Sequence, residues 1–395
     1  MKRILTFILT LTLALSFCVN SFAAATTATA SETQTGTSEA QTDTSKTQAD
    51  TSEAQTDTSK VQAGASYGIS NLSGAPDIVA ESAVVMDANT GTILYGKEAD
   101  TKRYPASITK VMTALLAVEN CKMSDVITYS NAAVNGIEAG SSTAGINVGA
   151  KLTVEDSLYA LMLVSANEAA AAIAEHISGS TTEFAKLMTK RAKELGCKNT
   201  QFKNPHGLPD EEHYTTAYDM GLILKEAMKH PEFRKIAGTI SYTLKKSDSL
   251  TDTLELWNHA KILRQNSDYY YEYAKGAKTG FTQVALNTLV TYAKKDNVEL
   301  ICVILKDHGA DKSYTDTANL FKWAFNQVKA VTPLTNFSLK TAMTENSSID
   351  SAKLDQIQLL NSSYDTNFSV LVKKDFDEST LKTAFKLDED KKTGR

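Results

Sequence analysis

Apolar and polar positions divide the chain into stretches of very different character. Residues 4–17 are almost all apolar and follow two basic residues, Lys2 and Arg3. Residues 26–66 consist mainly of Thr, Ser, Ala, Gln and Asp and contain almost no large apolar side chain. Only from about Pro76 onward do apolar positions recur with the periods of strands and helices. We therefore expect the folded part of the protein to begin there.

The elements predicted for the folded part alternate in kind. Short strands are expected at residues 82–86 and 92–95. A long helical region follows from residue 108 to about 195, and within it Thr153 is expected to cap a helix with Asp156 as its partner. The chain then returns to strands, and a last helix is expected to bury one apolar face. These strands span residues 286–292 and 299–305, and the apolar face comprises Leu320, Phe321, Ala324, Phe325 and Val328.

This order predicts an α/β (α+β) domain at residues 76–330, in which helices are inserted between strands. Residues 331–395 are polar and contain short strand-like pieces such as 368–372. We expect them to form a partial, small β-rich C-terminal domain whose tail leads into a further strand.

The N-terminal stretch predicts export. Its basic start, its apolar run and the small residues that follow are typical of a signal peptide spanning residues 1–25. The run is shorter than the roughly 18 apolar residues of a membrane span, which argues against a transmembrane anchor. Residues 26–75 are expected to be a solvated linker, in which the sequence of 37–50 recurs nearly unchanged at 51–64. A peripheral association with the membrane stays open.

Composition and charge exclude several classes of function. The formal net charge is −5, and no basic cluster suggests binding to nucleic acid. Cys121, Cys197 and Cys302 are widely separated and form no metal-binding pair. His206 and His213 share a loop, but no third ligand lies near them in the sequence. We therefore expect neither a metal nor a cofactor.

The first motif with chemical potential is Ser107-Ile108-Thr109-Lys110, directly before an apolar helical stretch at 111–118. With Ser107 at the start of a helix, Lys110 lies on the same face, where the two side chains can meet. A serine hydroxyl is a weak nucleophile, and a lysine can serve as its base once burial and nearby positive charge lower the lysine pKa. By itself the motif is more often a helix-capping serine followed by a surface lysine.

The second motif, Ser165-Ala166-Asn167, stands between two helical runs. A hydroxyl and an amide on one interhelical turn can relay a proton and bind a substrate amide. Seen alone, the pair is more typical of helix capping.

The third motif, Lys278-Thr279-Gly280, precedes a strand pattern. The glycine permits close approach of a ligand, and the lysine and threonine suit a carboxylate. The same tripeptide recurs at residues 392–394 in the polar tail, which shows how little a single match indicates.

Order, spacing and context make the three motifs informative together. S-x-x-K, S-x-N and K-T-G occur here at a helix start, an interhelical turn and a strand, which is the signature set of penicillin-binding proteins and serine β-lactamases. Residues 76–330 resemble the low-molecular-mass D-alanyl-D-alanine carboxypeptidases, serine peptidases of the penicillin-binding protein 5 type. The resemblance is carried by PASITKVMTAL at 105–115, GSS at 140–142, SANEA at 165–169, NPHGLPDEEHYTTAYD at 204–219 and KTGFT at 278–282.

The resemblance implies a fold and an activity. The expected fold is a β-lactamase/transpeptidase-like domain, with an antiparallel sheet flanked by helices and an α-helical subdomain. The expected reaction removes the terminal D-alanine from peptidoglycan stem pentapeptides, and β-lactam antibiotics are expected to acylate the same serine. The expected location is extracytoplasmic, in the cell envelope.

The resemblance also implies catalytic roles. Ser107 is expected to attack the carbonyl between the two terminal D-alanines, and Lys110 to take its proton. Ser165 is expected to pass a proton to the departing D-alanine.

Four further residues are implied in substrate binding. Asn167 is expected to hold the substrate backbone, and Lys278 and Thr279 to position its terminal carboxylate. The backbone N–H groups of Ser107 and Phe281 are expected to form the oxyanion hole.

Other activities stay open at this point. D,D-endopeptidase or transpeptidase activity on cross-links is the nearest alternative. A β-lactamase needs rapid deacylation, commonly with a glutamate after the second motif, and Glu211 and Glu212 lie in that stretch. An inactive penicillin sensor is the remaining alternative. Two places depart from the family pattern: Glu168 stands where Asp is usual, and Val284-Ala285-Leu286 follows the K-T-G strand where an Ala-Gly pair is common.

Overall fold

The computed structural model describes residues 69, 72–247, 250–332 and 369–380. The predicted signal peptide, and most of the predicted linker and C-terminal domain, lie outside these residues, so those expectations stay predictions. Among the described residues, no helix combines the length and the apolar character needed to cross a membrane.

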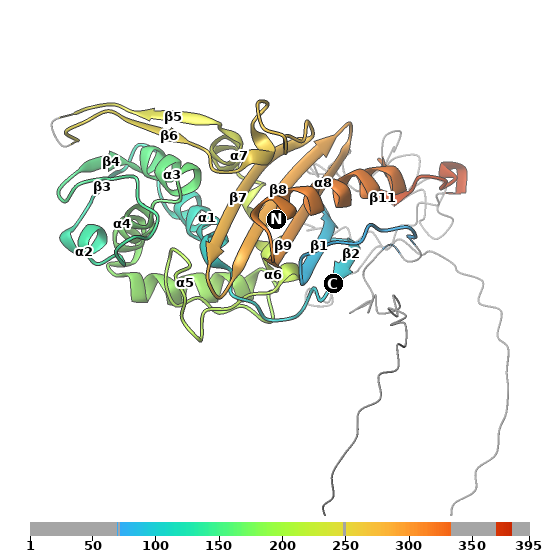
Figure 1. Ribbon diagram of the computed structural model, residues 1–395, viewed down its shortest axis with the longest axis horizontal. Helices are drawn as coiled ribbons and strands as arrows, with labels where there is room; N and C mark the ends of the chain where they lie inside the picture. The colour runs from blue at the N-terminus through green and yellow to red at the C-terminus, as the bar shows by residue number, and fades with distance from the viewer. Residues whose placement is uncertain (1–68, 70–71, 248–249, 333–368, 381–395) are drawn as a thin grey trace, which may run out of the picture.

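A five-stranded antiparallel sheet forms the centre of the fold, with the strand order β2-β1-β9-β8-β7 (Figure 1). Its strands are β1 (Ser82–Asp87), β2 (Ile93–Lys97), β7 (Ala274–Thr282), β8 (Leu286–Lys295) and β9 (Val298–Asp307). The N-terminal hairpin joins the C-terminal strands through β1 and β9, in a register that places Val84 opposite Val303. β7 stands at one edge, so its outer side has no strand partner within the described residues.

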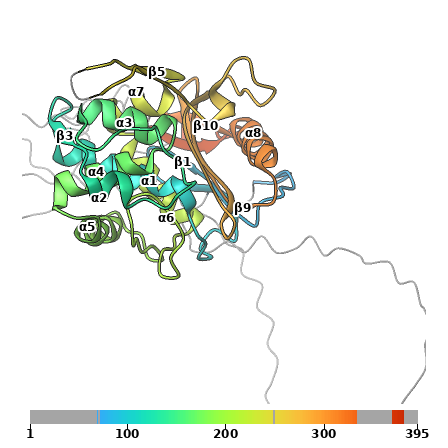
Figure 2. The same ribbon diagram turned by 60° about the vertical axis from the view of Figure 1, so that its left-hand side comes forward.

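Both faces of this sheet are buried, which explains why β1 and β9 are almost continuously apolar. Successive side chains of a strand point to opposite faces. Val84 and Met86 therefore join the core on the side of the helices that stand between β2 and β7 in the chain. Ala83 and Val85 join the core beneath α8 (Ala310–Gln327). Figure 2 shows α8 on one side of the sheet, with α1 (Lys110–Asn120) and α6 (Ala217–Ala227) on the other.

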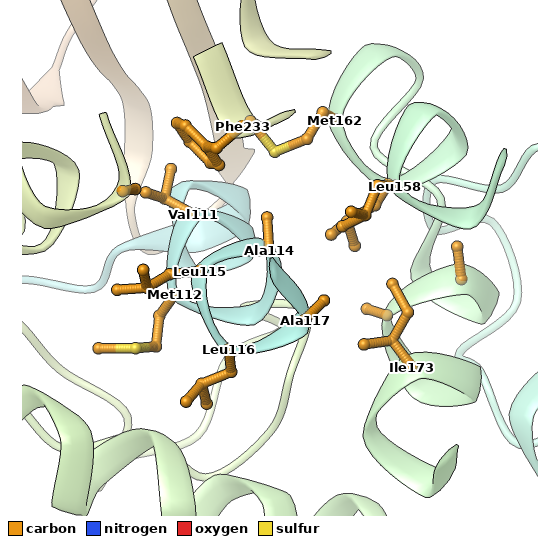
Figure 3. Packing of buried hydrophobic residues seen from close by; sticks show 14 of the residues in the cluster. Val111, Met112, Ala114, Leu115, Leu116, Ala117, Leu158, Met162, Ile173 and Phe233 are labelled. Carbon is orange, nitrogen blue, oxygen red and sulfur yellow. The ribbon is translucent and has the colours of Figure 1, made fainter. Parts of the chain in front are cut away.

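The helices inserted between β2 and β7 cover one face of the sheet and form a subdomain beside it (Figure 1). They are α1 (Lys110–Asn120), α2 (Asn131–Asn135), α3 (Val154–Leu163), α4 (Asn167–Ser178), α5 (Thr181–Glu194), α6 (Ala217–Ala227) and α7 (Pro231–Gly238). Leu158 of α3, Ile173 of α4 and Phe233 of α7 pack around α1 (Figure 3). Because α1 is surrounded in this way, its first residue, Lys110, is held inside the protein.

Local sequence signals predicted several of these elements and missed others. Thr153 caps the N-terminus of α3 as predicted, since its hydroxyl accepts a hydrogen bond from the backbone N–H of Asp156 at 3.0 Å. The expectation of one helical region was wrong, because the two-stranded sheet of β3 (Val126–Thr128) and β4 (Lys151–Thr153) lies within it. Strands of three residues are too short to show a period. Val328 is buried as predicted, but it begins β10 (Val328–Val331) and is not part of α8.

Short elements complete the described fold. β5 (Ser241–Leu244) and β6 (Leu254–Trp257) pair as a hairpin next to α3, and β10 pairs with β11 (Val370–Lys373), which lies in the predicted C-terminal domain. Three short helices are η1 (Ala106–Thr109), η2 (Lys261–Leu263) and η3 (Glu378–Thr380).

Candidate active site

Ser107 lies in η1, which leads directly into α1. The preceding residue, Ala106, has a φ of 50°, an uncommon conformation for alanine that bends the chain at this serine. Lys110 is the first residue of α1, and its Nζ lies 3.0 Å from Ser107 Oγ. The structure thus brings the serine and the lysine of the first motif within hydrogen-bonding distance.

Lys110 is fully buried, and its Nζ has two partners besides Ser107. They are Asn167 Oδ1 at 2.7 Å and the carbonyl oxygen of His206 at 2.8 Å. Both oxygens are acceptors only, so each accepts a hydrogen bond from an N–H group of the lysine. A neutral amine has two N–H groups and one lone pair. With both N–H groups donated, the lone pair is left for the Ser107 hydroxyl, which suits Lys110 to receive its proton.

The surroundings of Lys110 favour the neutral amine. Burial, and then the positive charge of Lys278, lower the pKa of Lys110 well below its ordinary value, while the Glu168 carboxylate acts in the opposite direction. Burial also lowers the pKa of Lys278 to about 7. His206 adds no positive charge near neutral pH, because burial lowers its pKa to about 3.

The loop of residues 204–208 supplies the carbonyl oxygen that accepts from Lys110, a role that no sequence pattern predicted. Asn204 Oδ1 closes this loop by accepting a hydrogen bond from the N–H of Gly207 at 2.7 Å. Thr113 of α1 holds the loop by donating to one of its carbonyl oxygens at 2.6 Å. The loop lies in a stretch that carries the family resemblance, but a functional backbone carbonyl leaves no mark on side-chain identity.

Gly207 lets this loop touch the turn that carries the serine. Its φ is 91°, and a Cβ at this position would lie 1.9 Å from the carbonyl oxygen of Ala106. Both the backbone conformation and the contact therefore require glycine.

Ser165 and Asn167 lie where the sequence placed them, at the turn between α3 and α4. Ser165 has a φ of 63°, and its buried Oγ has no hydrogen-bonding partner within the described residues. Asn167 begins α4, and its buried side chain contacts Lys110. Leaving a buried hydroxyl unpaired costs free energy, and such groups call for a functional explanation. The Ser165 hydroxyl is therefore available to a ligand.

The third motif lies on β7, the edge strand that packs against η1. Lys278 is buried, and its Nζ donates to the carbonyl oxygen of Thr279 at 2.8 Å. A Cβ at Gly280 would lie 2.8 Å from the backbone nitrogen of Ser107, so the glycine allows β7 to pass directly against the serine. The next residue, Phe281, is 56% exposed. All three motifs thus approach one place from distant parts of the chain.

Two further contacts fasten η1, and the sequence predicted neither. Thr288 of β8 donates to the carbonyl oxygen of Pro105 at 2.9 Å. Thr109 Oγ1 lies 2.9 Å from His213 Nε2. His213 Nδ1 accepts from the backbone N–H of Lys203, so the neutral ring carries its proton on Nε2 and donates to Thr109. Burial keeps this ring neutral by lowering its pKa to about 4.

Comparison with known proteins agrees with this geometry. The model of the peptidase S11 family, D-alanyl-D-alanine carboxypeptidase, matches residues 70–309. The chain belongs to this family. The D-alanyl-D-alanine carboxypeptidase DacF of Bacillus subtilis is 35% identical over 315 residues, which cover 78% of this chain and 76% of the relative. DacA of Escherichia coli is 30% identical over 67% of this chain and 65% of its own length.

Solved structures of carboxypeptidase-family proteins share the fold. The D-alanyl-D-alanine carboxypeptidase of Mycobacterium tuberculosis has a TM-score of 0.59 and 26% identity, covering 65% of this chain and 95% of that chain. The Streptomyces K15 DD-transpeptidase has a TM-score of 0.59 and 31% identity, covering 64% of this chain and 99% of that chain. The predicted fold class and the predicted class of serine peptidase are confirmed.

One departure from the carboxypeptidase pattern leaves a trace in the backbone. Leu286 begins β8 with a φ of 55°, a conformation that glycine adopts without strain. The left-handed region costs an ordinary residue roughly 1–2 kcal/mol. The turn between β7 and β8 therefore keeps a glycine-like conformation although leucine occupies the position.

One cluster of side chains in the described residues has a spacing that suits a metal ion, namely Glu119, Glu226 and His230. Arg191 already binds both carboxylates, since its Nη2 lies 2.6 Å from Glu119 Oε1 and 3.6 Å from Glu226 Oε1. Hydrogen bonding to Glu119 raises the pKa of Arg191. This cluster is an ion-pair network that fastens α5 to α1 and α6, and it lies apart from the serine site.

Proposed function

We propose that the protein is a serine D-alanyl-D-alanine carboxypeptidase that removes the terminal D-alanine from peptidoglycan stem pentapeptides through an acyl-enzyme on Ser107. The observation that carries this proposal is the hydrogen bonding of Lys110, whose two acceptor partners leave its lone pair for the serine hydroxyl. The names of the relatives support the substrate class.

In the acylation step, Ser107 Oγ attacks the carbonyl carbon between the two D-alanines while its proton moves to Lys110 Nζ. The carbonyl oxygen becomes an oxyanion, which accepts hydrogen bonds from the backbone N–H groups of Ser107 and Phe281. Each donor of this kind contributes roughly 3 kcal/mol to transition-state stabilisation. The close approach of Gly280 to the backbone nitrogen of Ser107 supports the pairing of these two donors.

The intermediate then collapses by breaking the C–N bond. The proton held by Lys110 reaches the departing D-alanine nitrogen through Ser165 Oγ, a role supported by the absence of any other partner for this hydroxyl among the described residues. Asn167 binds an amide of the substrate backbone, and Lys278 and Thr279 bind the terminal carboxylate. Water attacks the acyl carbon in a second step, which releases the shortened peptide and restores the Ser107 hydroxyl.

The same site accounts for two further parts of the proposal. β-Lactam antibiotics acylate Ser107 because their strained amide presents a carbonyl to the same nucleophile. The predicted signal peptide at residues 1–25 supports export to the cell envelope, where the peptidoglycan substrate lies.

Release of free D-alanine from a pentapeptide ending in D-Ala-D-Ala tests the activity. We expect turnover by the wild-type protein and none by Ser107→Ala, while Ser379→Ala, at an exposed serine outside the site, keeps wild-type turnover. Rapid hydrolysis of nitrocefin without peptide cleavage would contradict the proposal and indicate a β-lactamase. Stable penicillin labelling without any peptide turnover would contradict it in favour of a sensor.

The likeness to the Streptomyces K15 DD-transpeptidase favours a second candidate, transfer of the acyl group to an amine. Adding an amino-acid acceptor to the same assay separates the two activities. A carboxypeptidase yields mainly the hydrolysed tetrapeptide, whereas a transpeptidase yields mainly the product that carries the acceptor.

A further inference from the structure

Glu168 is a buried carboxylate beside the site that has no part in the mechanism above. It lies in the first turn of α4, directly after Asn167, and is 2% exposed. Its Oε1 accepts hydrogen bonds from Thr143 Oγ1 at 2.7 Å, from Ala144 N at 2.7 Å and from Gly145 N at 3.1 Å. Hydrogen bonds to a carboxylate are stronger than those between neutral groups. This single oxygen therefore holds several groups of one short loop in place.

The same loop is tied to Asn167. The backbone N–H of Asn167 donates to the carbonyl oxygen of Ser142 at 2.9 Å. Two consecutive residues of α4 therefore hold residues 142–146, one through the main chain and one through its side chain. Ser142 and Thr143 are exposed on this loop, next to the asparagine that contacts Lys110.

We propose that Glu168 is a positioning residue, which fixes residues 142–146 as the wall of the active site beside Asn167. The proposal rests on the proposed carboxypeptidase function for the identity of the substrate. Asn167 is proposed to bind the substrate backbone, so this wall faces the acyl portion of the stem peptide, on the side of the scissile bond that stays on Ser107.

The Glu168 carboxylate also contributes charge to the site. Its second oxygen, Oε2, is buried without a hydrogen-bonding partner within the described residues. Its negative charge raises the pKa of Lys110, against the effects of burial and of Lys278. The other titratable groups near Lys110 are His206 and His213, which are neutral because burial lowers their pKa values to about 3 and about 4.

Two conservative variants separate the contacts from the charge. Glu168→Gln keeps an oxygen that accepts from the loop and removes the charge. Glu168→Asp keeps the charge but is one methylene shorter, so it withdraws the oxygen from the loop. Glu175→Gln is the matched control, since Glu175 lies on the same helix and accepts a hydrogen bond from Ser130, outside the active site.

The rate of acylation of Ser107 by a fluorescent penicillin, measured against pH, reads out both effects. The rate falls at low pH as Lys110 becomes protonated, and this part of the profile is the acid limb. For Glu168→Gln we expect the acid limb to move to lower pH by at least about half a unit, because the pKa of Lys110 falls further. For Glu168→Asp we expect an unmoved acid limb and a rate roughly 10–100-fold lower, because the wall is displaced. Glu175→Gln is expected to match the wild type in both respects.

A purely structural role for Glu168 predicts lower thermal stability in both variants and no movement of the acid limb. A wild-type rate in Glu168→Asp overturns the proposal, and an unmoved limb in Glu168→Gln overturns the effect of the Glu168 charge on Lys110. Penicillin acylation does not depend on peptide turnover. A wild-type protein that fails to release D-alanine therefore refutes the proposed function, while the role of Glu168 is still tested.

Discussion

Replacing Gly207 by alanine tests whether the loop that binds Lys110 must touch the turn that carries Ser107. A Cβ on Gly207 would lie 1.9 Å from the carbonyl oxygen of Ala106 and 2.4 Å from its carbonyl carbon. Both atoms belong to the main chain, so no side-chain rotation relieves the collision. We expect the loop and the turn to separate by about 1 Å, since real Cβ contacts are essentially never shorter than 3.0 Å.

Gly196 offers a matched control. Its φ is also 91°, but nothing lies within 4 Å of a Cβ placed on it. Alanine in the left-handed region costs roughly 1–2 kcal/mol, and both variants bear this cost. Overpacking adds about 1–3 kcal/mol in Gly207→Ala alone. We therefore expect the free energy of unfolding to fall by about 1–2 kcal/mol in Gly196→Ala and by about 2–5 kcal/mol in Gly207→Ala.

Activity separates the two variants further. A displacement of about 1 Å at a reacting group lowers the rate on the order of 100-fold, so Gly207→Ala is expected to be acylated by penicillin about 100 times more slowly than the wild type. Gly196→Ala is expected to react at the wild-type rate. Rates are taken per folded molecule, below the unfolding midpoint of each variant. A Gly207→Ala protein that is no less stable than Gly196→Ala and reacts at the wild-type rate would refute the reasoning.

Three other predictions concern single buried groups. Ser165→Ala removes an unpaired buried hydroxyl, so its Tm should equal or exceed that of the wild type while peptide cleavage falls about 100-fold or more; a lower Tm with full activity contradicts this. Lys278→Met removes a charge that lowers the pKa of Lys110, so the acid limb of penicillin acylation should move to higher pH, and an unmoved limb argues against this coupling. Burial raises the pKa of Asp307 from 3.8 to about 6, so the folded state loses stability as the pH rises through this range. Asp307→Asn should therefore unfold at a higher temperature than the wild type at pH 7, with the difference disappearing near pH 4; a constant difference across this range excludes titration as its cause.

Local patterns in the sequence determined much of the secondary structure. Strands β8 and β9 are rich in apolar and β-branched residues, and Thr153 and Asp156 lie three residues apart, so a short stretch of sequence is enough to predict each feature. The pairing of Ser107 with Lys110 is also local, because residues three apart on one turn of helix face the same way. The first motif therefore predicts the contact between Ser107 and Lys110 without any tertiary information.

Only the tertiary structure decided what these groups are able to do. The neutral form of Lys110 is favoured because α3, α4 and α7 surround α1. It is also favoured because β7, which is far from α1 in the sequence, places the positive charge of Lys278 nearby. Its second acceptor is the carbonyl oxygen of His206, and every residue of the chain carries such a carbonyl. Burial, charge and a backbone acceptor are set by segments far apart in sequence, and for that reason the residues around Ser107 alone did not reveal them.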